Sequence, residues 1–307
     1  MLHELLAVAS GSLVGFTLGL VGGGGSIMAV PLLVYVVGVP SPHVAIGTSA
    51  IAVAASAATN LFGHTRAGTV KWRCALVFAL AGIVGAAGGA QLGKMVDGSR
   101  LLVLFGVLMV VVGLMMLRPR KAGGDRDVML TRESMPRLLP LLLGVGFSVG
   151  ALMIVVGLMM LRPRKSGGNP DVKLSRESMP HLLPRLIGIG FAVGTLSGFF
   201  GIGGGFLIVP GLLFSTGMPM ISAIGSSLLS VGSFGLTTAV NYAVSGLIDW
   251  PVAGEYIAGG IAGGLLGMRL SMHLASRKAA LNQVFAGFVF VVAAYMLYRN
   301  FGALTAS

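Results

Sequence analysis

Two glycine-rich breaks interrupt apolar segments of this chain and carry the residues best suited to bind a ligand. The breaks read GLVGGGGSIMAVPLL, residues 19–33, and GFFGIGGGFLIVPGLL, residues 198–213. Glycine runs and a proline disfavour a continuous helix, which leaves backbone N–H groups free at each interruption. Such groups, with the positive end of a helix dipole, favour anions. We predict an oxyanion cradle made of Gly22, Gly23, Gly24, Gly25, Ser26, Gly201, Gly203, Gly204 and Gly205.

The same glycines also suit close helix packing, because small residues let backbones approach each other in a membrane. Gly11, Gly15 and Gly19 have GxxxG spacing, and packing is the preferred interpretation for them. In hydrocarbon, a broken backbone is tolerated only where protein buries it or where it lines a wet cavity. The two breaks are therefore expected to meet near the bilayer midplane and to enclose a polar cavity.

Hydroxyl and amide side chains follow each break. Thr48 and Ser49 lie in AIGTS, and Ser226 and Ser227 lie in AIGSS. These hydroxyls could donate to an anion or bond back to their own helix. Asn60 and Asn241 are further candidates, with hydrogen bonding between helices as the alternative. Glu255 is a candidate for proton coupling, with a solvated position at the membrane interface as the alternative.

Other chemistries are poorly matched. GGAQLGKM, residues 88–95, lacks the hydroxyl residue of a phosphate-binding loop, and GIGGGF lacks the acidic partner of a dinucleotide site. The five histidines are scattered without the spacing of metal ligands, and Cys74 is the sole cysteine. We predict no catalytic residues, no metal, no cofactor and no enzymatic activity.

The elements that position these residues are predicted to be transmembrane helices. The chain has 307 residues, of which 55% are hydrophobic and only 10% charged, against roughly 25% charged in soluble domains. Broken segments are predicted at 4–37 and 182–216, and continuous spans near 44–63, 73–93, 100–117, 222–243, 252–268 and 281–299. Of 21 lysines and arginines, twelve lie in 118–137 and 162–185, which is typical of membrane loops rather than of nucleic-acid binding. The fold class is all-α, a polytopic transmembrane helical bundle.

The bundle is predicted to consist of two homologous halves with glycine-broken helices. Glycines of the first break recur 179 positions later, and AIGTS, Trp72 and Gly85 recur 178 positions later. We divide the chain into a first transmembrane repeat (1–118), basic loops with a duplicated chimeric helix (119–180) and a second transmembrane repeat (181–307). Parallel repeats follow if each broken segment crosses the membrane once, and inverted repeats follow if each is re-entrant. The basic joints at 64–73 and 269–278 favour inversion weakly.

A second repeat lies inside the first. Residues 109–152 and 153–196 are identical at 32 of 44 positions. Their junction creates an uncharged segment, Leu138–Leu161, which is long enough to cross a bilayer once. A single crossing would put the two basic loops on opposite faces, although their charges favour the same face.

The paired GxxGxGGGxxxVP-type breaks, the AIGTS and AIGSS segments and the two four-segment halves resemble the sulfite exporter TauE/SafE family. The resemblance covers the whole chain apart from one copy of the 44-residue unit. It implies export of a small sulfur-containing oxyanion, such as sulfite or sulfoacetate, across a bacterial inner membrane by alternating access. The implied partners are a small anionic substrate and the lipid bilayer; the sequence indicates no oligomeric state. The alternative is a non-transporting scaffold or an impaired duplicate of such a transporter, because the insert disturbs topology.

Overall fold

The structure is a computed structural model that describes residues 2–117, 179–201, 205–218 and 220–273. The first half contains α1 (Leu2–Val21), the 3-10 helix η1 (Gly22–Met28), α2 (Ala29–Leu32), the π-helix η2 (Leu33–Val37), α3 (Pro42–Arg66), α4 (Trp72–Met95) and α5 (Gly98–Leu117). The second half contains α8 (Met179–Phe200), α9 (Gly205–Thr216), α10 (Met220–Val244) and α11 (Trp250–His273). Every regular element in these ranges is a helix, so the predicted all-α class is confirmed.

Several of these helices are long and apolar enough to cross a bilayer. Within the described ranges five qualify, namely His3–Leu20, Pro42–Arg66, Trp72–Met95, Leu182–Phe200 and Ile221–Val244. Two shorter apolar stretches, Gly25–Val37 and Gly98–Val110, accompany them. The predicted spans therefore coincide with observed helices, except for 281–299 and Leu138–Leu161, which lie outside the described residues.

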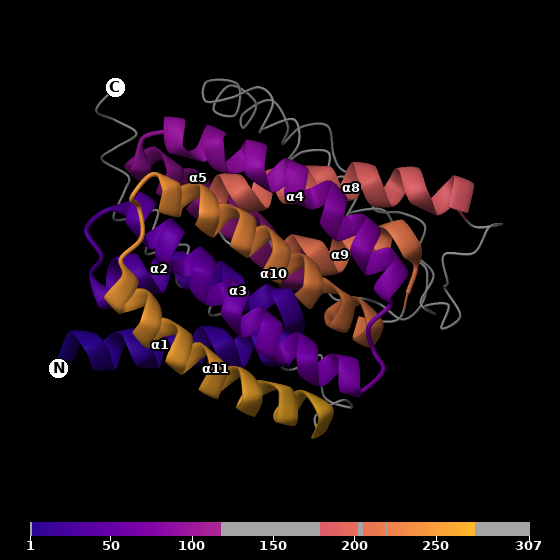
Figure 1. Ribbon diagram of the computed structural model, residues 1–307, viewed down its shortest axis with the longest axis horizontal. Coiled ribbons are helices and arrows are strands. Elements are labelled where there is room, and N and C mark those ends of the chain that lie inside the picture. Colours follow the sequence, from indigo (N-terminus) through magenta and orange to yellow (C-terminus); the bar gives the residue numbers. More distant parts are fainter. Residues whose placement is uncertain (1, 118–178, 202–204, 219, 274–307) are drawn as a thin grey trace.

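The first broken segment is a re-entrant hairpin. Gly22 has a φ of +75°, which favours glycine and ends α1. The chain then turns back, and α1 contacts η1, α2 and η2 in succession. In Figure 1, α2 lies beside the N-terminal part of α1. Gly38, with a φ of +87°, ends η2, and α3 begins on the same side of the molecule after a Ser41 cap.

The two halves run in opposite directions. Along α10, Gly225, Gly232 and Gly235 lie against His64, Ala57 and Ala54 of α3, so these two helices are antiparallel. Because α3 and α10 occupy corresponding positions in the two sequence repeats, the repeats are inverted. The structure thus selects the re-entrant, inverted alternative that the basic joints favoured, and it excludes parallel repeats.

Each half packs its first helix against the other half. Along α1, Gly11, Gly15 and Gly19 meet Tyr256, Gly260 and Gly264 of α11, in that order. Along α4, Gly82, Gly85 and Gly89 meet Gly190, Phe191 and Thr195 of α8. A Cβ atom at any of these glycines would collide with neighbouring atoms, which are mostly backbone atoms of the partner helix except at Gly82, where the ring of Phe234 is nearest. We call the two contacts the glycine seams. Close packing is therefore the role of Gly11, Gly15 and Gly19.

The described charges are distributed unequally between the two ends of the bundle. The N-terminal face, which holds Leu2, the 38–41 joint and the start of α11, carries the four acidic residues of the described ranges, together with two cations: Glu4, Asp97, Asp249, Glu255, Lys94 and Arg100. The opposite end, which we call the basic face, carries Arg66, Lys71, Arg73, Arg185 and Arg269. Cationic loops of membrane proteins accumulate on the cytoplasmic side.

Candidate functional site

The first glycine break is a buried 3-10 turn between α1 and α2. Gly23, Gly25 and Ser26 are all buried, and the Ser26 hydroxyl donates to the carbonyl oxygen of Gly23 over 2.9 Å. Gly24 lies in the same turn. A Cβ at Gly25 would stand 2.5 Å from Oγ1 of Thr17, so the turn folds tightly back onto α1.

The second break begins in the same way. Gly201 has a φ of +66°, and its N–H donates to the carbonyl oxygen of Gly198 over 3.2 Å. Gly205 is the first residue of α9. Gly203 and Gly204, which the sequence placed in the oxyanion cradle, lie outside the described residues.

Each break reaches into the other half of the molecule. A Cβ at Gly22 would stand 2.8 Å from Cγ2 of Ile224, and one at Gly201 would collide with the side chain of Ile46. Ile46 and Ile224 are the isoleucines of AIGTS and AIGSS. Each break is therefore packed against the AIGTS or AIGSS segment of the opposite half, but the two contacts lie at opposite ends of the bundle. Gly225, next to Ile224, lies against His64 at the basic face, and Gly47, next to Ile46, lies against Tyr242 at the N-terminal face. Gly22 and Gly201 do not meet near the bilayer midplane as predicted; the helices that follow them, η1 and α9, contact each other instead.

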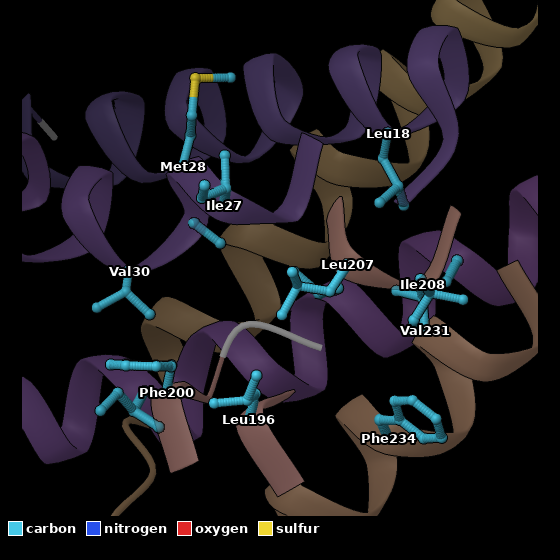
Figure 2. Close-up of a cluster of buried hydrophobic side chains, with 14 of the residues drawn as sticks. Leu18, Ile27, Met28, Val30, Leu196, Phe200, Leu207, Ile208, Val231 and Phe234 are labelled. Atoms are coloured by element: carbon cyan, nitrogen blue, oxygen red, sulfur yellow. The ribbon is translucent and has the colours of Figure 1, made fainter. Parts of the chain in front are cut away.

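The surroundings of the breaks differ from the predicted polar cavity. Figure 2 shows that Leu18, Ile27, Met28, Leu196, Phe200, Leu207, Ile208 and Val231 fill this region with apolar side chains. All of them are buried. The physical reason is the interlocking of the halves, because each break is covered by aliphatic and aromatic residues of its partner. Among the described residues, η1 and α9, which follow Gly22 and Gly201, are in direct contact.

Thr48 and Ser226 make equivalent bonds between the halves. Oγ1 of Thr48 accepts the backbone N–H of Asp249 at 3.0 Å, and Oγ of Ser226 accepts that of Lys71 at 2.9 Å. The two hydroxyl residues are 178 positions apart, and so are Asp249 and Lys71. Each bond fixes the residue that precedes a helix of the opposite half, α11 at the N-terminal face and α4 at the basic face. We call these bonds the two latches.

We expect removal of a latch hydroxyl to loosen one face of the helical bundle. Thr48→Val keeps the shape of the side chain but leaves the N–H of Asp249 without its acceptor, at a cost of about 1–3 kcal/mol. Cysteine accessibility near Asp249 should rise, whereas accessibility near Lys71 should not. Ser226→Ala should give the opposite pattern, and equal accessibility in both variants would contradict independent latches.

The remaining predicted hydroxyls face their own helices. Ser49 donates to the carbonyl oxygen of Ile46 over 2.9 Å, and Ser227 donates to that of Ile224 over 2.8 Å. Both serines are fully buried. Each hydroxyl thus has its hydrogen-bond partner within its own helix, as serine hydroxyls commonly do.

The three further candidates lie in three different places. Asn60 is fully buried beside Gly19 and Gly264, donates to the carbonyl oxygen of Ser56 over 2.9 Å, and keeps Oδ1 without a partner among the described residues. Asn241 lies at the end of α10, where its Oδ1 accepts from Gln91 at 2.8 Å and from Lys94 at 3.2 Å. Glu255 lies in the second turn of α11 and is partly buried. The structure does not bring the three together.

Several buried hydroxyls escaped the sequence analysis. Ser197, Ser230 and Thr238 are fully buried, and their hydroxyls have no partner within the described ranges. Thr238 follows Asn60 by 178 positions, so the repeat offset pointed to Thr238 rather than Asn241 as its counterpart. These three side chains are unused hydrogen-bond donors in the second half. A search for three or more histidine, cysteine or carboxylate side chains that could share a metal found none in the part of the chain described here.

Known proteins share extensive sequence similarity with this chain. A family model described as sulfite exporter TauE/SafE matches residues 7–152 and again residues 145–296. The chain is 44% identical, over 302 residues, to a "Probable membrane transporter protein" of Xylella fastidiosa (strain 9a5c), with 98% of each chain covered. It is 25% identical, over 267 residues, to "Probable membrane transporter protein YunE" of Bacillus subtilis (strain 168), which covers 83% of this chain and 84% of the relative. No solved structure matches significantly.

Proposed function

The chain belongs to the sulfite exporter TauE/SafE family of membrane transporters, and on that premise we propose that it exports a small sulfur-containing oxyanion by alternating access. The substrates that we propose are sulfite, sulfoacetate and related organosulfonates. The protein is an integral, multi-pass membrane protein and not an enzyme. Since the relatives come from bacteria, we assign it to a bacterial cell membrane.

The interlocked inverted repeats are the observation that supports this mechanism. Inverted repeats commonly exchange two conformations by rocking one half against the other around a central site. Here each half inserts a re-entrant break into the other, at Gly22 against Ile224 and at Gly201 against Ile46. These two contacts lie at opposite faces. With both contacts formed, the arrangement corresponds to an occluded state, and rocking would open the contact at one face at a time.

An anionic substrate agrees with the polar groups that remain unused. An anion that leaves water needs hydrogen-bond donors to replace its hydration. Ser197, Ser230 and Thr238 supply buried hydroxyl donors on α8 and α10. Backbone N–H groups at the two breaks would add to them when the halves separate.

Transport measurements test this proposal. Purified protein in vesicles should move labelled sulfite or sulfoacetate down an imposed gradient, faster than protein-free vesicles do. Chloride and phosphate serve as comparison anions in the same preparation. Equal rates for protein and protein-free vesicles with every sulfur anion would overturn the assignment of substrate.

The tandem repeat provides the test of the second candidate, an impaired duplicate. Deletion of residues 118–161 removes one 44-residue unit and joins Leu117 to the RPRK sequence at 162–165, which repeats that at 118–121. Every described residue is retained. If the repeat impairs function, the deletion variant should transport faster than the full chain; if transport is unchanged, that candidate fails.

The charge distribution predicts how the protein is oriented in the membrane. Because the basic face should be cytoplasmic, an impermeant thiol reagent should label Pro40→Cys in intact cells but not Ala67→Cys, both in a Cys74→Ala background. Pro40 and Ala67 are exposed on the N-terminal and basic faces, and Cys74 is buried. Permeabilised cells should show labelling at both positions. Labelling of Ala67→Cys alone in intact cells would reverse the orientation.

A further inference from the structure

We propose that Tyr242, Lys94 and His43 form an oxyanion-binding site at the N-terminal face, where the exported anion is held before release. The inference rests on the proposed function for its direction of transport. The site lies where α3 and α4 of the first half meet α10 of the second half. None of its three residues belongs to a glycine break or to the predicted cradle.

A buried phenol without a partner is the first observation. Tyr242 is fully buried near the end of α10, and its hydroxyl has no hydrogen-bond partner among the described residues. A buried donor normally finds an acceptor, because its desolvation is otherwise uncompensated. The Cβ atom of Tyr242 packs against Gly47 of the AIGTS segment, so the base of the side chain is in close contact with α3.

His43 provides a second buried polar atom that lacks a hydrogen-bond partner. The ring centroids of His43 and Tyr242 are 6.4 Å apart, and Nδ1 of His43 is buried without a partner in the described ranges. His43 lies in the first turn of α3, a helix of 25 residues. The N-terminal end of such a helix favours an anion through its dipole.

Lys94 supplies a fixed positive charge. Its ammonium nitrogen lies 5.9 Å from the centroid of the Tyr242 ring. It donates to the backbone oxygen of Asn241 at 3.2 Å, to Oδ1 of Asn241 at 3.2 Å and to Oγ of Ser245 at 3.0 Å. Both residues are at the end of α10, so the charge stays next to the phenol. Asp249, the carboxylate in the adjoining loop, accepts the N–H of Val252 at 3.2 Å and is engaged with the start of α11.

The combination selects the ligand. The phenol and the imidazole offer hydrogen-bonding atoms, and the ammonium group of Lys94 offers positive charge, which suits an oxyanion and not a metal cation. One lysine matches a small anion such as sulfite or a sulfonate. Because Lys94 and His43 belong to the first half and Tyr242 to the second, rocking of the halves would change the distance of Tyr242 from the other two residues and so the affinity.

The opposite face carries a related but different arrangement. His64 occupies the position 178 residues before Tyr242, and it lies against Gly225 as Tyr242 lies against Gly47. Nδ1 of His64 is 3.0 Å from Oγ1 of Thr69. The phenol with its neighbouring ammonium is therefore a feature of the N-terminal face, which makes the proposed site one-sided.

Binding to purified protein tests the site. Titration with sulfite should show that Tyr242→Phe, which deletes only the hydroxyl, weakens binding about tenfold, and that Lys94→Met weakens it at least as much. Tyr256→Phe is the matched control, since it deletes a buried phenol hydroxyl that donates to Ala29 at 3.2 Å on another part of the bundle. Its affinity should equal that of the wild type.

Each outcome bears on one proposal. Wild-type affinity in both Tyr242→Phe and Lys94→Met would overturn the site, while transport of sulfite would still support the function. Tyr242-dependent binding of phosphate or chloride without binding of sulfite would support the site and overturn the sulfur substrate. Absence of any anion binding to the wild type would also overturn the site. If Tyr242→Phe fails to fold, the Lys94→Met result decides.

Discussion

Replacing Gly22 by alanine is expected to abolish transport while the protein still inserts into the membrane. The φ of +75° at this position costs a non-glycine residue about 1–2 kcal/mol. The new Cβ would also stand 2.8 Å from Cγ2 of Ile224, and such overpacking costs a further 1–3 kcal/mol or so. The two effects act at the contact between break and opposite half, on which the proposed mechanism depends.

A control variant and a rescue variant distinguish the effect of backbone strain at Gly22 from that of the steric collision with Ile224. Gly38 has a φ of +87° but open space around it. Gly38→Ala should therefore cost only the free energy of the unfavourable backbone conformation. Ile224→Ala removes the colliding methyl group, and the double variant should therefore transport better than Gly22→Ala alone. Transport activity and thermal stability in detergent are the measurements. If Ile224→Ala gives no relief, the contact between the halves is not what limits Gly22→Ala.

Replacing Gly89 by leucine should remove most of the folded protein. Gly89 lies in the seam between α4 and α8, where a Cβ would collide with the backbone of Thr195 and approach the N–H of Phe199 at 2.9 Å. Backbone atoms on both sides cannot move aside as a flexible side chain can. The helices would have to separate, and interhelical packing is a main source of stability for membrane helices.

The neighbouring glycine is a matched control. Gly88 lies one position earlier on α4, is exposed, and has open space where its Cβ would be. Gly88→Leu should leave the yield of monodisperse protein unchanged or raise it slightly, since leucine favours both helix and hydrocarbon. Fluorescence-detected size-exclusion chromatography compares the two variants. Similar yields of Gly88→Leu and Gly89→Leu would show that the seam does not depend on glycine.

The helices and their interruptions could be predicted because they depend on local chemistry. The length of the apolar segments predicted α3, α4 and α10. The glycine runs, with Pro31 and Pro210, predicted the interruptions. The direction of the repeats could not be decided in the same way. It depends on whether the chain turns back after Gly22, and the glycines permit either course.

The candidate site was less predictable because its contacts are distant in sequence. The partner of Thr48 is the N–H of Asp249, a backbone group that carries no side-chain signal. Nor did the sequence indicate that apolar side chains such as Leu207 and Phe200 would form the core around the re-entrant segments. Tyr242 was overlooked because a lone tyrosine near a helix end is a common interfacial residue, and only its burial without a partner distinguishes it.

The exchange of first helices between the halves limits what either half can do alone. A polypeptide containing only α1 to α5 would leave the glycine stripe of α1 facing lipid, because its partner α11 belongs to the other half. Two copies of that polypeptide could rebuild both seams only if they entered the bilayer facing opposite ways, as dual-topology subunits do. Joining both halves in one chain removes that requirement, because the connecting segment then determines which half faces which way.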